Sequence, residues 1–217
     1  KRATRRAVTE LRKLVNANAW QYVTQNNDTC TPLFATFTFR YDINDITTAN
    51  TLFLKFIHRL NYKLSGRSKK AYSKYVSVIG FQDKNRNGVI HYHTMFFNLS
   101  AGQEAFLYDT WSEGMVNIQK VEDIENVGLY MSKHITEASG DERLVGHKRY
   151  FASKGLYKAI EVKDQDKAQS IISFIPSDYV PIKDTFTGFQ GKVMCSRYSL
   201  NRGELLPDIV PEIKAFI

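Results

Sequence analysis

A predicted β-hairpin constrains the fold of this chain more than any other sequence feature. The segments Tyr75–Phe81 and Val89–Leu99 are rich in β-branched and aromatic residues, which favour strands. Between them, residues 83–88 read Asp-Lys-Asn-Arg-Asn-Gly, a typical turn sequence whose Asn-Gly pair is its strongest signal. We therefore expect two neighbouring antiparallel strands joined by a short loop.

Further strands and helices are predicted on both sides of the hairpin. Leu33–Phe39 alternates threonine with apolar residues, which indicates a strand, and Met115–Val121 is a shorter one. Helices are expected at residues 3–25, Thr48–Leu64, Gln103–Trp111, Glu122–Ala138 and Asp164–Phe174, and later strands at Tyr179–Phe186 and Lys192–Leu200. This β-α-β-β-α-β-like order predicts an α+β fold, a central antiparallel sheet with helices packed on one face.

Length and composition fit a folded domain with an extension. The chain has 217 residues, of which 43% are hydrophobic and 24% are charged, so wholesale disorder is excluded. We assign residues 1–160 to the principal domain and 161–217 to a C-terminal extension packed on it. Cys30 and Cys195 cannot form a disulfide framework or a zinc finger, which favours a reducing, cytoplasmic location. We expect no membrane-spanning helix.

Positive charge is concentrated in the first third of the sequence. Residues 1–75 contain 14 basic and 4 acidic side chains, whereas residues 76–217 contain 16 and 18. A one-sided basic surface with interleaved aromatic residues predicts a nucleic-acid partner, and a solubilising charged surface is the alternative. The candidate contacts in this region are Arg5, Arg6, Arg12, Lys69, Lys70 and Lys74.

Two histidines of the second hairpin strand are candidate metal ligands. Side chains two residues apart on a strand point to the same face, so His91 and His93 share one face and Tyr92 points to the other. Neutral imidazole is a common ligand of divalent cations, and the pair could hold one ion. Two strand histidines without a metal are the alternative.

A third ligand is expected from the preceding strand. With a four-residue loop, Asn85–Gly88, Gln82 lies opposite His91 and shares its face. Asp83 is the better ligand chemically, and it would take this place if a bulge or a one-residue shift changed the register. We favour Gln82 and keep Asp83 as the alternative.

A polar stripe on a later helix is the candidate nucleophile cluster. Tyr130, Lys133, His134 and Glu137 are spaced to lie on one helix face. Tyrosine is a poor nucleophile at its ordinary pKa near 10, but a nearby cation and a metal-polarised phosphate would activate it. A solvated face without chemistry is the alternative.

In this order, the motifs resemble those of rolling-circle replication initiators of the HUH endonuclease superfamily. These enzymes have a His-hydrophobic-His strand followed by a helix with Tyr-x-x-Lys, which His91-Tyr92-His93 and Tyr130–Lys133 match. The strand Ala35–Phe39 resembles the first motif of the family. Residues 148–156 resemble a segment that follows the tyrosine helix in plasmid and phage members.

The chain departs from the family pattern at two positions. Many relatives have a Glu as third ligand in the strand before the hairpin, where this chain has Gly80, so the ligand role falls to Gln82. Relatives with two tyrosines have the second one four residues after the first, where this chain has His134. The resemblance therefore implies an enzyme with a single catalytic tyrosine.

The resemblance implies a DNA nicking and joining endonuclease. Mg²⁺ or Mn²⁺ would be held by the histidines, and Tyr130 would attack the scissile phosphate to leave a 5′-phosphotyrosyl link and a free 3′-OH. Lys133 would position the phosphate or lower the pKa of Tyr130, and His134 or Glu137 would transfer protons. The implied partners are single-stranded or hairpin origin DNA, a host helicase and a polymerase. Further DNA contacts are expected from Arg149, Tyr150 and Lys154.

Four alternatives share some of these features. A conjugative relaxase has its tyrosine before the histidines. A transposase of the same superfamily keeps the present order but tends to be smaller, and it does not account for residues 148–156. A non-catalytic RNA-recognition-type sheet needs exposed aromatic residues, for which Phe37, Phe39 and Phe81 are candidates. A metal-dependent phosphodiesterase with water as nucleophile would not need Tyr130.

Overall fold

The computed structural model describes residues 2–19, 22–23, 30–66, 72–82, 88–121, 127–175, 182–188 and 191–197. The chain divides into two compact units, Lys1–Ala159 and Ile160–Ile217. The second unit contains helix α5 (Gln165–Ser173), which is capped by the Asp164 carboxylate, and a hairpin of β6 (Ile182–Gly188) and β7 (Gly191–Arg197). Among the described helices, none has both the length and the apolar character needed to cross a bilayer.

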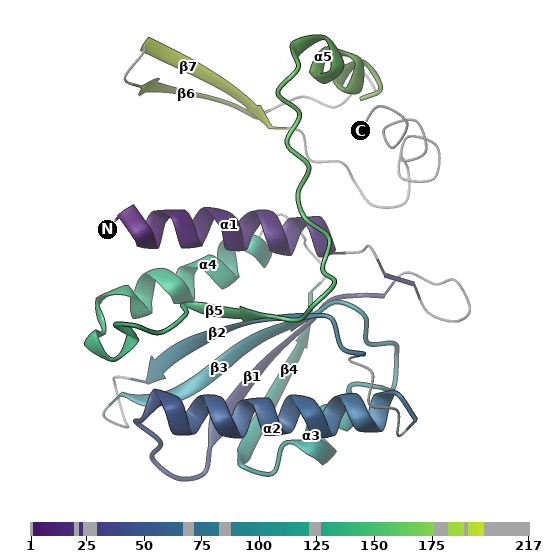
Figure 1. Ribbon diagram of the computed structural model, residues 1–217. Helices are drawn as coiled ribbons and strands as arrows, with labels where there is room; N and C mark the ends of the chain where they lie inside the picture. Colours follow the sequence, from purple (N-terminus) through teal and green to yellow (C-terminus); the bar gives the residue numbers. More distant parts are fainter. Residues whose placement is uncertain are drawn as a thin grey trace. The chain divides into compact units, whose positions relative to one another are not determined.

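The first unit is built on a five-stranded antiparallel sheet with the strand order β4-β1-β3-β2-β5 (Figure 1). The strands are β1 (Leu33–Phe39), β2 (Tyr75–Gln82), β3 (Val89–Phe96), β4 (Gly114–Lys120) and β5 (Tyr150–Ala152). The predicted hairpin is present as β2 and β3. Because β1 and β2 both run antiparallel to the β3 strand between them, they are parallel to each other. The predicted α+β class with a central antiparallel sheet is confirmed.

Helices cover both faces of this sheet, so the prediction that they pack on one face is wrong. Helices α1 (Arg2–Asn18) and α4 (Val127–Glu137) lie on one face, and α2 (Ile46–Leu64) and α3 (Ala105–Thr110) lie on the other (Figure 1). The physical reason is that the central strands are apolar on both sides, as the fully buried run from residue 75 to 80 shows. Each apolar face needs a helical layer of its own.

The core on the α2 face is largely aromatic. Phe37 of β1 packs against Phe53 and Phe56 of α2, with ring centroids 6.0 and 4.8 Å away, and against Trp111 after α3 at 5.2 Å. All four side chains are buried. Burying each such ring contributes about 1.5–3 kcal/mol, so this cluster holds α2 and the α3–β4 connection on the sheet.

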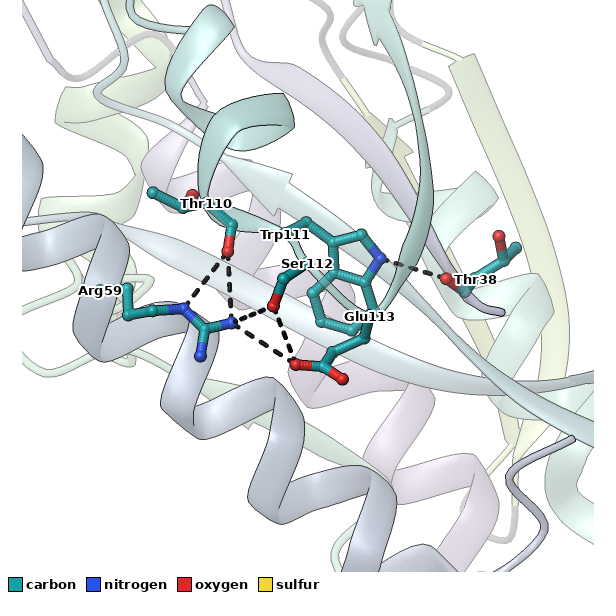
Figure 2. A network of polar contacts seen from close by, with 6 residues as sticks. All are labelled: Thr38, Arg59, Thr110, Trp111, Ser112 and Glu113. Atoms are coloured by element: carbon teal, nitrogen blue, oxygen red, sulfur yellow. Dashed lines mark hydrogen bonds and ion pairs between the residues drawn. The ribbon is translucent and has the colours of Figure 1, made fainter. Parts of the chain in front are cut away.

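Polar contacts fix the start of β4 beside β1 (Figure 2). Arg59 on α2 donates hydrogen bonds to the carbonyl oxygen of Thr110 at 3.2–3.3 Å and to Ser112 Oγ at 3.3 Å. The indole Nε1 of Trp111 donates to the carbonyl oxygen of Thr38 at 3.1 Å. These bonds join α2, the loop before β4 and the end of β1.

Replacing Trp111 with Phe tests this junction. The substitution keeps an aromatic ring in the core but removes the hydrogen bond to Thr38 and part of the buried area. We expect the free energy of unfolding to fall by about 1–2 kcal/mol in urea titrations. Tyr41→Phe is the control, because Tyr41 is 74% exposed and its change should stay within about 0.5 kcal/mol. Equal stability of both variants would contradict the proposed contribution of the indole.

Candidate active site

The two candidate metal ligands lie at the centre of the sheet. Strand β3 places Tyr92 on the α2 face, where its hydroxyl donates to Asn50 Oδ1 at 2.6 Å, and turns His91 and His93 to the α4 face. Their Nε2 atoms are 2.9 Å apart. Two nitrogens bound at adjacent corners of an octahedral ion, at about 2.1 Å each, are separated by about 3 Å, so the pair fits a Mg²⁺- or Mn²⁺-like cation.

The His93 ring is held on several sides. Its Nδ1 lies 3.1 Å from Thr36 Oγ1 on β1, and its ring stacks between Phe34 at 5.6 Å and His134 at 3.7 Å. Burial, together with the nearby His134 and His91, lowers the pKa of His93 to about 2. The imidazole is therefore neutral near pH 7, which is the protonation state of a metal ligand.

Helix α4 brings the candidate nucleophile to the same group of rings. Met131 and Ile135 are buried against α1 and the sheet, which sets the rotation of the helix. Tyr130 then contacts Phe34 edge-on at 4.8 Å, and it contacts His134 at 5.0 Å. Phe34 and His134 are also the rings that stack on His93. The side chain of Tyr130 is 44% exposed, so its surface position leaves room for a substrate.

The rest of the predicted polar stripe divides between buried and exposed positions. Glu137 Oε2 lies 3.2 Å from Nδ1 of the largely buried His134, and Glu137 Oε1 lies 3.6 Å from Lys133 Nζ. Lys133 and Glu137 are both more than half exposed, so their ion pair contributes little to stability. Burial lowers the pKa of His134, against the opposing effect of Glu137.

The register of the hairpin differs from the prediction. Gly80, and not Gln82, lies opposite His91, and Gln82 lies opposite Val89. The chain between the strands is residues 83–88, two residues longer than the predicted loop. A shift of two residues keeps Gln82 on the histidine face but moves it toward the end of the hairpin, where it is exposed. The alternative ligand, Asp83, lies outside the described residues.

Gly80 shapes the space beside the histidines. A Cβ atom at this position would clash with His91 Nε2, so the imidazole occupies the space that a side chain would fill. Next to it is a cleft of about 310 Å³, whose lining includes His91, His134, Glu137 and Asp141. Across the described part of the chain, no three histidine, cysteine or carboxylate side chains already form a metal-binding group.

The predicted DNA contacts near the N-terminus lie on α1, which packs against α4. Arg5 and Arg6 are exposed, and Arg12 is partly buried. Lys69 and Lys70 lie outside the described residues. The helix therefore presents basic groups on the layer of the molecule that carries Tyr130.

The candidate contacts after α4 are at the β5 edge of the sheet. Lys74 Nζ donates to the carbonyl oxygen of Lys154 at 2.9 Å. Tyr150 pairs with Val78 in the sheet, and burial raises its pKa. Arg149 lines a groove of about 500 Å³, and its buried Nη1 has no hydrogen-bond partner among the described residues. Lys74 and Tyr150 thus have structural roles here, whereas Arg149 has an unused donor.

The sequence motifs did not identify two residues that hold the site. Phe34 and Thr36 were predicted only as strand residues, although both lie on the histidine face of β1. Their position opposite β3 was the missing information, since neighbours in an antiparallel sheet share a face.

The structure also bears on the RNA-recognition-type alternative. Phe37 and Phe39 are 0% and 2% exposed, and the partly buried Phe81 lies beneath the Arg143 guanidinium. The three aromatic side chains named for such a binding sheet are therefore buried or covered.

The comparisons with known proteins bear on the segment that contains these residues. Among curated proteins, none matches the chain. A family model for the replication-associated protein ORF2 matches residues 32–139, which extend from β1 to just after α4 and include His91, His93 and Tyr130. This segment is thus similar to a family of replication-associated proteins, which is consistent with a Rep-type replication initiator that binds DNA.

Proposed function

We propose that this protein is a metal-dependent, site- and strand-specific DNA endonuclease and ligase that initiates rolling-circle replication. One observation carries the proposal: Tyr130 and the His91–His93 pair meet in a single cluster of rings within the segment that matches the replication-associated family. A tyrosine beside two imidazoles suits phosphoryl transfer to a phenol. A non-catalytic sheet would not require these three side chains together.

In the proposed reaction, Tyr130 Oη attacks phosphorus in a single DNA strand. The Oη–P bond forms and the P–O3′ bond breaks, while the phenol loses its proton and the 3′-oxygen gains one. A Mg²⁺ or Mn²⁺ ion held by His91 and His93 would supply positive charge to the phosphate oxygens. The products are a 5′-phosphotyrosyl link and a free 3′-OH.

The link conserves the bond energy, so the same site can rejoin the strand without ATP. A host polymerase would extend the 3′-OH, and a host helicase would unwind the duplex ahead of it. Single-stranded or hairpin origin DNA is the proposed substrate, because a phosphate reaches a partly exposed tyrosine more easily in an unpaired strand.

Other side chains position these groups. Thr36 accepts a hydrogen bond from His93 Nδ1–H, which leaves Nε2 as the ligand atom. Phe34 keeps the rings of Tyr130 and His93 at fixed separations. Lys133 lies one turn from Tyr130 at the surface, where its ammonium group can approach a bound phosphate.

A covalent-adduct assay tests this function. Labelled single-stranded oligonucleotides, drawn from a randomised pool, are incubated with the full chain and Mn²⁺ and separated on a denaturing gel. We expect a protein–DNA adduct that EDTA abolishes and excess Mn²⁺ restores. Cleavage without any adduct would instead support water as the nucleophile, and an adduct that forms in EDTA would contradict the metal requirement.

A further inference from the structure

We propose that His134 is the third protein ligand of the metal, in place of the carboxylate that Gly80 cannot supply. This inference rests on the proposed function, because it assigns a further ligand in the same site. The first observation is a buried nitrogen atom. His134 Nε2 is shielded from solvent and has no hydrogen-bond partner among the described residues, although such atoms are nearly always paired in folded proteins. A bound cation would satisfy it.

The second observation is the hydrogen bond at the other side of the ring. His134 Nδ1 lies 3.2 Å from a carboxylate oxygen of Glu137. A carboxylate accepts from an N–H group, so the proton of the neutral ring is on Nδ1 and the lone pair is on Nε2. A carboxylate behind an imidazole is the usual support of a metal-bound histidine, because it fixes the tautomer and orients the ring.

The third observation is the short distance to the imidazoles of β3. The ring centroids of His134 and His93 are 3.7 Å apart, and the side chain of His134 is only 14% exposed. Gln82, the ligand expected from the sequence, is exposed near the end of the hairpin. Asp141 also lines the cleft, but its carboxylate accepts hydrogen bonds from Arg143 at 2.8 and 2.5 Å. His134 is thus better placed than either one.

Binding requires a rotation of the His134 ring. The ring now lies nearly parallel to that of His93, with 19° between their planes, so the two lone pairs do not converge. The cleft of about 310 Å³ beside His134 and His91 provides the space for this rotation. It exists because Gly80 forms part of the wall without a side chain. A Mg²⁺- or Mn²⁺-like ion retains several water ligands, and the polar lining suits them.

The experiment measures Mn²⁺ binding by the full chain without DNA, from the electron paramagnetic resonance signal of the unbound ion. Removal of a group that merely supports a ligand typically weakens metal binding 10–100-fold, so His134→Ala should raise the Kd at least about tenfold. His134→Gln, which keeps a donor oxygen, should recover part of the affinity. Gln82→Ala is the matched control and should bind as the wild type does.

A second variant separates ligation from packing. His134→Phe retains a ring that can stack on His93 but has no nitrogen, so it should keep the melting temperature within a few degrees and still lose Mn²⁺ affinity. Wild-type affinity in His134→Ala or His134→Phe would overturn the assignment, as would an equal loss in Gln82→Ala. Because no DNA is present, a His134-dependent Kd supports the ligand assignment even if no covalent adduct ever forms.

Discussion

Tyr130→Phe should abolish the covalent adduct, a loss of at least about a thousandfold, and leave DNA binding at the wild-type level. The substitution removes only the hydroxyl oxygen that would attack phosphorus. The phenyl ring keeps its edge contact with Phe34 at 4.8 Å and its contact with His134 at 5.0 Å. The fold and the histidine pair should therefore be unaffected. Denaturing gels measure the adduct, and fluorescence anisotropy measures binding of the same oligonucleotide.

Tyr108→Phe is the matched control for this experiment. Tyr108 lies on α3, on the opposite face of the sheet, and its exposed fraction of 53% is close to the 44% of Tyr130. It should form the adduct at the wild-type rate. Persistent adduct formation by Tyr130→Phe would show that another residue is the nucleophile.

The double substitution His91→Ala, His93→Ala should have a comparably large effect on the chemistry. Both imidazoles are lost, and with them the two nitrogens 2.9 Å apart that would hold the ion against the phosphate. We expect no cleavage and no adduct, and the rise in melting temperature on adding Mn²⁺ should disappear. Binding of DNA should persist in part, because exposed basic groups on α1 such as Arg5 and Arg6 are unchanged.

His58→Ala, at an exposed position on α2, is the control for general effects of removing a histidine. It should retain cleavage and the Mn²⁺-dependent rise in melting temperature. Unchanged activity in the double variant would reject the metal site, whatever the result with Tyr130→Phe. Together the two experiments separate the nucleophile from the cation.

The elements of the fold could be predicted because their signals are local. Leu33–Phe39 has the bounds expected from its alternation with threonine, and the helix after Asp45 begins within two residues of the prediction. The Asn-Gly turn correctly placed β2 beside β3. These features depend on side-chain period and turn chemistry, which neighbouring residues determine.

The register and the layers could not be predicted in the same way. A hairpin shifted by two residues has the same facing pattern, so the sequence did not distinguish Gln82 from Gly80 as the partner of His91. The position of α4 on the histidine face depends on the burial of Met131 and Ile135 against α1 and the sheet. Such long-range packing leaves no periodic signal in a short segment, and the contact between His134 and His93 could not be foreseen.

The ring cluster of the active site joins segments far apart along the chain. Phe34, His93 and Tyr130 come from three separate elements, and they meet only when β1 pairs with β3 and α4 packs on the sheet. Closing the long intervening loops is entropically unfavourable, so no short fragment holds this geometry by itself. A nascent or partly unfolded chain would therefore be harmless to DNA, and strand scission would begin only once the whole domain has matured.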